Sequence, residues 1–365
     1  MNICIIGDGL TALSLAKNLI NKKINVHIYH KKINKNFLSS RTIGISKNNL
    51  EFFKKEIFEL PKKITWKIKR IEIFSEKLEK DKILNFENGN NNLFYMLKND
   101  QLYKFLNKEI LKNKFCKKMV IKEKNFYDKL LKKNDYDLII NCDQDNVISK
   151  KFFTKKINKN YNNIAYTTIL EHKKLKNESA VQVFTSAGPI AFLPISNTKT
   201  SVVCSLDIKK KFYSNKEVLE LINFHNPKFK IKNISKLGNH KLEFSNLRSY
   251  YYKNILAFGD LLHKIHPLAG QGFNMTLRDI KCLSHIIQDK IDLGLQLNTS
   301  VLEKFQKETK NKNFIFSSGI DFVHEFFNFD KKIMRKDANI IMKFFGTNKS
   351  FMKSIIKLAD KGLNI

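Results

Sequence analysis

The first residues that could do chemistry form a glycine-containing turn, Gly7-Asp8-Gly9-Leu10-Thr11-Ala12, directly after the apolar run Asn2–Ile6. Gly7 permits a tight turn off a strand, and the missing Cβ at Gly9 lets a pyrophosphate approach the backbone. The small Ala12 lets the following helix pack closely on the strand, and that helix would direct its free N–H groups at the phosphates. The pattern predicts a dinucleotide site, with an ordinary strand–helix turn as the alternative.

A second and more specific motif extends from Gly259 to Asn274, with the sequence GDLLHKIHPLAGQGFN. Asp260 follows an expected strand and could accept hydrogen bonds from a polyol such as ribitol. Gly270-Gln271-Gly272 would leave backbone N–H groups uncovered at a helix N-terminus, where they could stabilise negative charge on a reduced isoalloxazine ring. Pro267 would stiffen the approach to this turn. The two motifs together predict an FAD site.

Two histidines of the second motif, His263 and His266, are three residues apart in the sequence, which raises the alternative of a metal site. No set of carboxylates or cysteines accompanies them, so a loop beside the flavin is the favoured interpretation and we expect no metal. His266 and Pro267 are the candidates for contact with a substrate.

One position of the predicted dinucleotide site departs from the usual pattern. The second strand of such a unit normally ends in a carboxylate that binds the hydroxyls of the adenosine ribose. This chain has His30 there. A neutral imidazole exchanges a single hydrogen bond at each nitrogen and cannot bind two hydroxyls as a carboxylate does. We therefore expect His30 to contact the cofactor, and we expect either weaker cofactor binding or a neighbouring residue that compensates for the missing carboxylate.

The elements around the first motif predict a strand–helix–strand unit. Apolar residues recur at helical spacing from Leu10 to Ile20, and a second strand is expected over Asn25–His30. Further buried strands of the same parallel sheet are expected over Tyr136–Cys142 and Asn254–Phe258, the latter leading into Gly259.

The middle of the chain has a different pattern. Strand-like runs occur at 164–170, 180–184, 190–195 and 201–206, with a hairpin turn expected at 197–200. The predicted fold class is therefore α/β, with a Rossmann-like FAD-binding domain interrupted by a β-rich substrate domain and followed by helices. The expected boundaries are 1–70, 98–150 and 245–310 for the FAD-binding domain, 71–97 and 151–244 for the substrate domain, and 311–365 for the helical segment.

Composition limits the partners and the compartment. The net charge of +33 comes almost entirely from lysine, because only five arginines occur, so base readout of a nucleic acid is disfavoured and no nucleic-acid partner is expected. The five cysteines are widely spaced, which favours a reduced, cytoplasmic protein. No apolar run is long enough to span a membrane, although a membrane-facing surface on the Phe-rich segment 314–352 is an alternative to simple core packing.

The second motif, together with the following Met275-Thr276-Leu277-Arg278-Asp279, resembles the flavin motif of group A FAD-dependent aromatic-ring monooxygenases. Within that group it most resembles the hydroxylases of ubiquinone biosynthesis. The segment Arg41–Ser46 resembles the family's Arg-x-x-Ala-Leu-Ser segment, in which the arginine lies near the flavin. Phe184–Pro194 resembles its substrate-sheet segment, and Leu358–Leu363 resembles its tail. The resemblance implies a fold like that of para-hydroxybenzoate hydroxylase.

The same resemblance implies a third cofactor contact in mid-chain, where the family has an Asp-Gly motif that contacts both FAD and NAD(P)H. Here the corresponding stretch is Cys142-Asp143-Gln144-Asp145-Asn146. Asp143 is retained, but Gln144 replaces the glycine and the usual downstream serine is missing.

The chemistry implied by the resemblance needs no protein nucleophile. NAD(P)H reduces FAD, oxygen adds to the reduced flavin, and a flavin hydroperoxide hydroxylates a polyprenylated phenol or quinol precursor of ubiquinone. Implied partners are molecular oxygen, other ubiquinone-biosynthesis proteins and transiently the inner face of a membrane. Two alternatives remain open: a catalytically degenerate flavoprotein-like subunit, favoured by His30 and Gln144, and a flavoprotein prenyl reductase.

Overall fold

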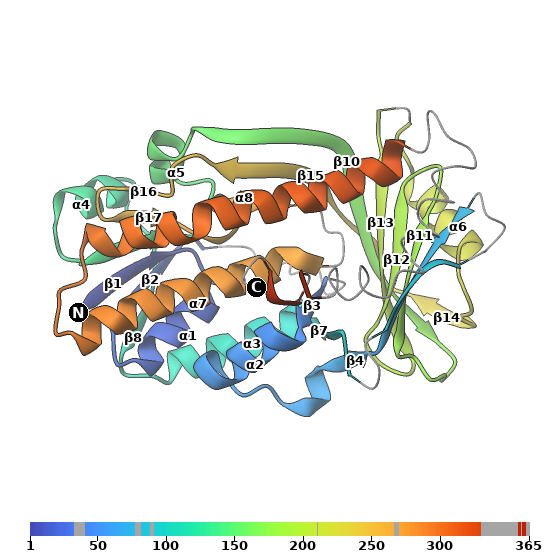
Figure 1. The fold of residues 1–365 in the computed structure, drawn as a ribbon, viewed down its shortest axis with the longest axis horizontal. Coiled ribbons are helices and arrows are strands. Elements are labelled where there is room, and N and C mark those ends of the chain that lie inside the picture. Colours follow the sequence, from blue (N-terminus) through green and yellow to red (C-terminus); the bar gives the residue numbers. More distant parts are fainter. Residues whose placement is uncertain are drawn as a thin grey trace.

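The computed structural model describes residues 1–32, 41–76, 82–87, 91–209, 211–265, 270–329, 357–358 and 360–362. Two large β-sheets lie side by side along the long axis of the molecule (Figure 1). The long helices α7 (Gln271–Asp292) and α8 (Thr299–Phe329) pack against each other, and α8 extends from the first sheet to the second.

The first sheet has six strands in the order β16-β17-β9-β1-β2-β8. Strand β1 (Asn2–Ile6) is buried at four of its five residues, as expected for a parallel strand that is covered on both faces. The pairings of β1 with β2 and β9, of β2 with β8 and of β9 with β17 are parallel, which confirms the predicted parallel sheet. The other strands are β2 (Asn25–His30), β8 (Cys116–Val120), β9 (Leu138–Asn141), β16 (Tyr251–Tyr252) and β17 (Ile255–Ala257).

Helices cover the first sheet and form the main hydrophobic core with it. Helix α1 (Leu10–Asn21) connects β1 to β2, and its Leu13, Ala16 and Leu19 are fully buried. Helix α1 also packs against α3 (Asn99–Leu111) and α7. The shorter helical elements are α4 (Phe126–Lys132), α5 (Val147–Phe152), η1 (Phe53–Ile57), η2 (Lys62–Ile64) and η4 (Gly259–Leu261).

The second sheet has nine strands, in the order β18-β15-β10-β13-β12-β11-β5-β6 with β14 paired to β10. Its pairings are antiparallel except that of β11 with β5. Helix α6 (Asn215–Phe224) covers one face, where its Val218 and Ile222 join the second core cluster. The strands are β5 (Arg70–Ser75), β6 (Lys82–Glu87), β10 (Lys156–His172), β11 (Ser179–Phe184), β12 (Pro189–Pro194), β13 (Lys199–Asp207), β14 (Ile231–Ile234), β15 (Gly238–Leu247) and β18 (His263–Lys264).

A three-stranded sheet lies between the two large ones, in the order β3-β7-β4. It consists of β3 (Thr42–Ser46), β7 (Phe94–Lys98) and β4 (Trp66–Ile68), and helix α2 (Lys47–Phe52) follows β3 directly. Because β7 pairs with β3, this sheet joins segments from both predicted domains. The two predicted domains are thus connected by strand pairing, and the predicted boundaries between them stay a prediction.

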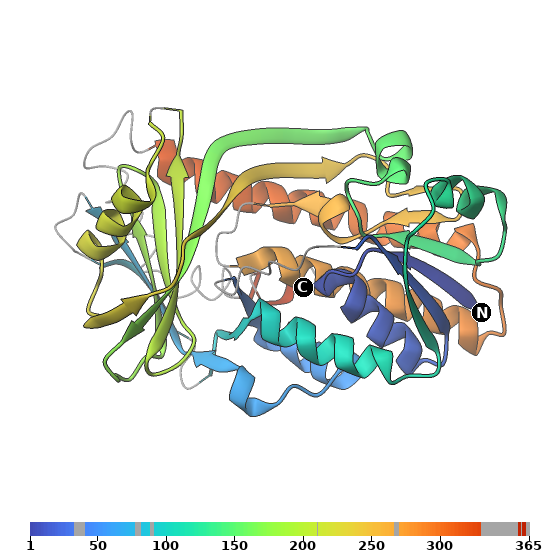
Figure 2. The same ribbon diagram turned by 180° about the vertical axis from the view of Figure 1, so that it is seen from behind.

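The α/β class is confirmed, and two local predictions differ from the structure. Strand β10 begins at Lys156, eight residues before the predicted run at 164. Its first residues pair with β15 as a ribbon that extends beyond the sheet (Figure 2), and the prediction missed them because they are polar and mostly exposed. The turn between β12 and β13 ends before Lys199, so the expected turn at 197–200 overlaps the start of β13.

Candidate functional site

The structure brings four predicted site residues to one edge of the first sheet. Gly7, His30, Asp143 and Gly259 lie at or just after the carboxyl ends of β1, β2, β9 and β17, which are neighbours in the sheet. A Cβ built on Gly7 would lie 3.6 Å from the backbone nitrogen of Asp143, and one built on Gly259 would lie 2.6 Å from Cγ2 of Thr11. The turns therefore pack directly on one another, at the position where α/β sheets bind ligands.

The start of α1 is open to a ligand. Gly9 is the N-cap of this 12-residue helix, makes no side-chain cap, and a Cβ built on it would meet no protein atom within 4 Å. Ala12 is fully buried against the sheet, as its predicted packing role requires. The first N–H groups of α1 therefore adjoin free space in the described part of the chain, which is the arrangement that binds phosphate.

A carboxylate does lie beside His30, but it comes from the turn and not from the end of the second strand. Oδ2 of Asp8 is 3.6 Å from Nδ1 of His30 and 3.4 Å from Nζ of Lys118, and it accepts a hydrogen bond from the Tyr103 hydroxyl at 3.1 Å. Asp8 is only 8% exposed. Burial, and then the negative charge of Asp8, raise the pKa of Tyr103. Asp8 was missed as a site residue, although the acidic residue between two glycines was a visible signal.

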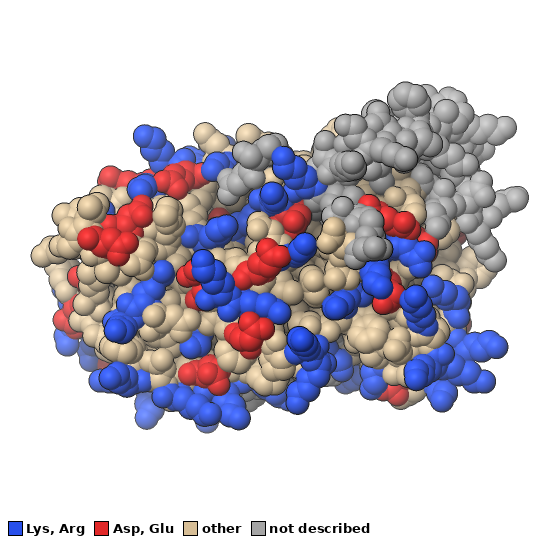
Figure 3. All heavy atoms as spheres, turned by 60° about the horizontal axis from the view of Figure 1, so that its bottom comes forward, with Lys and Arg blue, Asp and Glu red and all other residues tan. Residues whose placement is uncertain are grey.

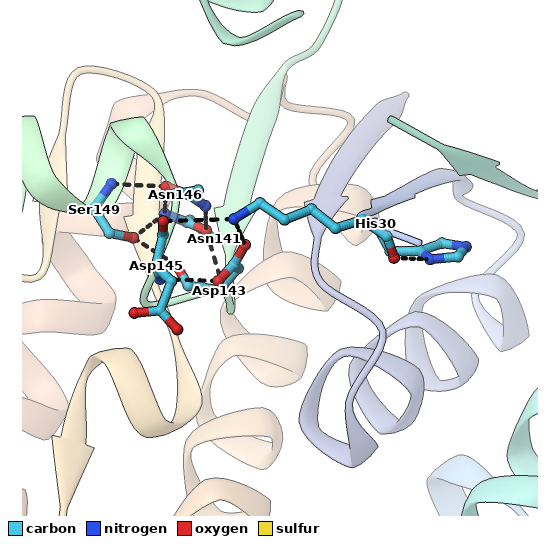
Figure 4. Close-up of polar contacts among 7 residues, drawn as sticks. His30, Asn141, Asp143, Asp145, Asn146 and Ser149 are labelled. Atoms are coloured by element: carbon cyan, nitrogen blue, oxygen red, sulfur yellow. Dashed lines mark hydrogen bonds and ion pairs between the residues drawn. The ribbon is translucent and has the colours of Figure 1, made fainter. Parts of the chain in front are cut away.

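The loop after β9 is a dense hydrogen-bonded unit (Figure 4). Asn146 accepts from the backbone N–H of Ser149 at 2.8 Å and so caps α5, and the Ser149 hydroxyl donates to the carbonyl of Asp143 at 2.5 Å. Ser149 was not predicted as a site residue. Gln144 replaces the family's glycine, and its φ is not positive. The replacement therefore does not strain the backbone, but it adds a side chain where the glycine would leave room for a ligand.

An ion pair joins the loops that follow β2 and β9 at this edge. Nζ of Lys31, which follows β2, is 3.5 Å from Oδ2 of Asp143, which follows β9. Strand β1 lies between those two strands, so the pair spans the glycine turn. Lys31 is half-exposed, and such pairs contribute little to stability because water screens them.

The second glycine motif meets the Arg41 segment. Gly270, with φ of 63°, is the N-cap of α7, and a Cβ built on it would lie 3.3 Å from the backbone nitrogen of Gly44 in β3. Asn274 donates to the carbonyl of Gly44 at 2.8 Å and accepts from the N–H of Ser46 at 2.9 Å. The buried Asn274 side chain thus holds β3 against α7, while Arg41 lies exposed just before β3.

Gln271 is the residue of this loop whose side chain best fits a polar ligand. It is 3% exposed, yet neither its amide nitrogen nor its amide oxygen has a hydrogen-bond partner in the described structure. Burying a polar amide without a partner costs about 1–3 kcal/mol. Asp260 is exposed at the same edge, and its negative charge adds to the effect of desolvation in raising the pKa of the partly buried Cys142 thiol. The residues present therefore fit a polar dinucleotide that crosses from Gly9 to Gln271.

The site lies between the two large sheets. The hydroxyl of Thr42, at the start of β3, donates to the hydroxyl of Ser201 in β13 at 2.9 Å. This contact joins the Arg41 segment to the face of the second sheet that is not covered by α6. A ligand at Gln271 would therefore adjoin that face.

Comparison with known proteins decides the family. Residues 137–363 match the family model described as squalene epoxidase. The chain belongs to the squalene epoxidase family. Relatives include the ubiquinone biosynthesis monooxygenase COQ6 of Xenopus tropicalis, 26% identical over 46% of this chain and 45% of that protein. The 3-demethoxyubiquinol 3-hydroxylase of Escherichia coli is 30% identical over 41% of this chain and 40% of that protein. The chain spans about half the length of the curated relatives it matches.

Solved structures share the fold of this squalene epoxidase family member. The p-nitrophenol 4-monooxygenase PnpA of Pseudomonas putida covers 98% of each chain with a TM-score of 0.77 and 13% identity. HpxO of Klebsiella pneumoniae, whose structure contains FAD and uric acid, covers 98% of this chain and 96% of its own with a TM-score of 0.75 and 11% identity. The predicted resemblance to group A FAD-dependent monooxygenases is confirmed.

Of the two histidines of the second motif, the structure describes only His263. His263 is buried, and its Nε2 lies 2.5 Å from Oδ2 of Asp279, whose other oxygen accepts from Asn313 at 2.8 Å. It therefore connects β18 to α7 and α8. His266 and Pro267, the predicted substrate contacts, lie outside the described residues. Within the described ranges, no group of three or more His, Cys, Asp or Glu side chains could hold a metal ion.

Proposed function

We propose that this chain is an FAD-dependent monooxygenase that hydroxylates a hydrophobic phenolic intermediate of ubiquinone biosynthesis. The observation that carries the proposal is the buried, unpartnered Gln271 amide at the start of α7, where Gly270 meets Gly44. The names of the relatives support the substrate class, since they include ubiquinone biosynthesis monooxygenases and a demethoxyubiquinol hydroxylase.

The residues divide into three binding roles, one for each part of the cofactor. The open N-terminus of α1 at Gly9 would hold the pyrophosphate, and the exposed Asp260 would accept hydrogen bonds from the ribitol hydroxyls. Gln271 and the free N–H groups of α7 would hold the polar edge of the flavin ring. When bound and reduced by NAD(P)H, FAD would supply the activation of oxygen. The second sheet would exclude water and orient the phenol.

The purified protein tests this proposal in three steps. We expect flavin absorption in the protein as isolated, oxidation of NAD(P)H that accelerates with a prenylated phenol, and incorporation of one labelled oxygen atom from O2 into the product. Flavin without NAD(P)H oxidation would instead indicate the degenerate subunit, which the altered Gln144 position favours. Oxidation of NAD(P)H without oxygen incorporation would indicate a prenyl reductase, and a colourless protein that binds no added FAD would contradict the proposal altogether.

Transient contact with a membrane surface is part of the proposal. Lysine and arginine side chains are spread over the face in Figure 3, with acidic side chains among them. Phe314 and Ile315 of α8 are 44% and 58% exposed. Among the described residues, no helix is both long and apolar enough to cross a bilayer.

We expect the protein to sediment with vesicles of anionic phospholipid at low salt and to be released as salt is raised, because screening weakens the attraction of lysines to the surface. Ile315→Glu should weaken sedimentation several-fold. Equal sedimentation with neutral vesicles, insensitive to salt, would contradict an electrostatic contact.

A further inference from the structure

The face of the second sheet opposite α6 carries a histidine that the proposed function has not used. Strand β10 alternates between the two faces: Tyr166 packs in the cluster under α6, and Ala165 packs on the other face with Tyr161 and Leu242. The Thr42–Ser201 hydrogen bond shows that this other face turns toward β3. We call it the inner face.

His240 lies on the inner face. It is directly opposite Ala165 in the β10–β15 pairing, so the two side chains point the same way. Leu242, two residues further along β15, joins Ala165 in the same cluster, as the two-residue period of a strand requires. His240 is only partly buried, and its imidazole has no hydrogen-bond partner in the described part of the chain.

Arg41 precedes Thr42, whose hydroxyl contacts Ser201 on the inner face. Burial, and then the positive charge of Arg41, lower the pKa of His240 below its ordinary value of 6.5. The imidazole is therefore neutral at neutral pH and keeps a lone pair that can accept a hydrogen bond. Arg41 leads directly into β3, which contacts Gly270 at the predicted flavin loop. The unpartnered acceptor on the inner face is thus within electrostatic range of a cation that lies beside the cofactor loop.

We propose that His240 accepts a hydrogen bond from the ring hydroxyl of the phenolic substrate, and that Arg41 stabilises the negative charge that builds up on this oxygen. The inference rests on the proposed function. A phenol whose hydroxyl donates to an acceptor gains electron density in its ring, and hydroxylation of an aromatic ring requires an electron-rich ring. His240 would therefore select phenols against their ethers.

The test compares two ligands that differ in whether the ring oxygen carries a hydrogen or a methyl group. Dissociation constants for 2-prenylphenol and its O-methyl ether are measured by equilibrium dialysis with the purified, flavin-loaded protein. The wild type should bind the phenol about tenfold more tightly than the ether, as one hydrogen bond allows. His240→Leu should reduce this ratio to about one, and Arg41→Gln should reduce it in part.

Asn239→Leu is the matched control, because Asn239 is exposed on the same strand and pairs with Tyr166 of the opposite face. It should keep the wild-type ratio. Should the leucine variant of His240 fail to fold, His240→Phe serves in its place. A His240 variant that folds and keeps the tenfold ratio would overturn the inference alone. If the wild type binds neither ligand, the proposed function fails as well, and the two failures are thereby distinguished.

Discussion

Gly9→Val should fold like the wild type and lose FAD affinity by on the order of 100-fold, equivalent to about 2.7 kcal/mol of binding free energy. The protein itself has room for the new side chain, since a Cβ on Gly9 meets nothing within 4 Å. The backbone there, with φ of −71°, is also compatible with any residue. The branched side chain would instead fill the space in which the pyrophosphate approaches α1.

The matched control is Gly319→Val in α8, where a Cβ also meets nothing within 4 Å but where we predict no ligand. Both variants should melt within a few degrees of the wild type without FAD, and only Gly9→Val should lose the flavin in a fluorescence titration. Unchanged FAD affinity in a folded Gly9→Val protein would place the pyrophosphate somewhere other than the start of α1.

Local patterns predicted the parts of this site that depend on short stretches of chain. The runs Asn2–Ile6 and Asn25–His30 coincide with β1 and β2. The first is a nearly continuous apolar segment, as expected for a buried parallel strand, and the second alternates apolar with polar residues. The two glycine motifs were found because each needs a backbone that a side chain would obstruct, as the positive φ of Gly7 and Gly270 now shows.

The remaining site features depend on contacts between distant segments, which one sequence does not reveal. Asp8 meets Lys118 only because β8 pairs with β2, and the residues of the glycine motif give no information about that strand pairing. His240 reaches the inner face through its register with Ala165, about 75 residues away, where a shift of one residue would reverse its direction. The start of β10 was missed because its exposed, polar residues lack alternation.

The buried pair of His263 and Asp279 should be the main polar support of the helices behind the site. Both side chains are 1% exposed, and Asn313 of α8 donates to the second oxygen of Asp279. Burial lowers the pKa of the neighbouring Arg278 to about 10. The negative charge of Asp279 acts in the opposite direction and favours the charged guanidinium. One carboxylate therefore accepts hydrogen bonds from a buried histidine and a buried amide, and its charge also favours the charged form of Arg278.

Asp279→Ala should lower the free energy of unfolding by about 3–5 kcal/mol, because it leaves the buried His263 imidazole and the buried Asn313 amide without their acceptor. Urea denaturation without FAD measures this. Glu123→Ala is the control, since it removes the exposed pair between Glu123 and Lys129, which water screens, and should lower the free energy of unfolding far less. Replacing both partners, His263→Leu with Asp279→Leu, should cost less than Asp279→Ala alone, because no buried imidazole is then left unpaired. A loss in Asp279→Ala no larger than in the control would mean that apolar packing alone holds α7 and α8 to β18.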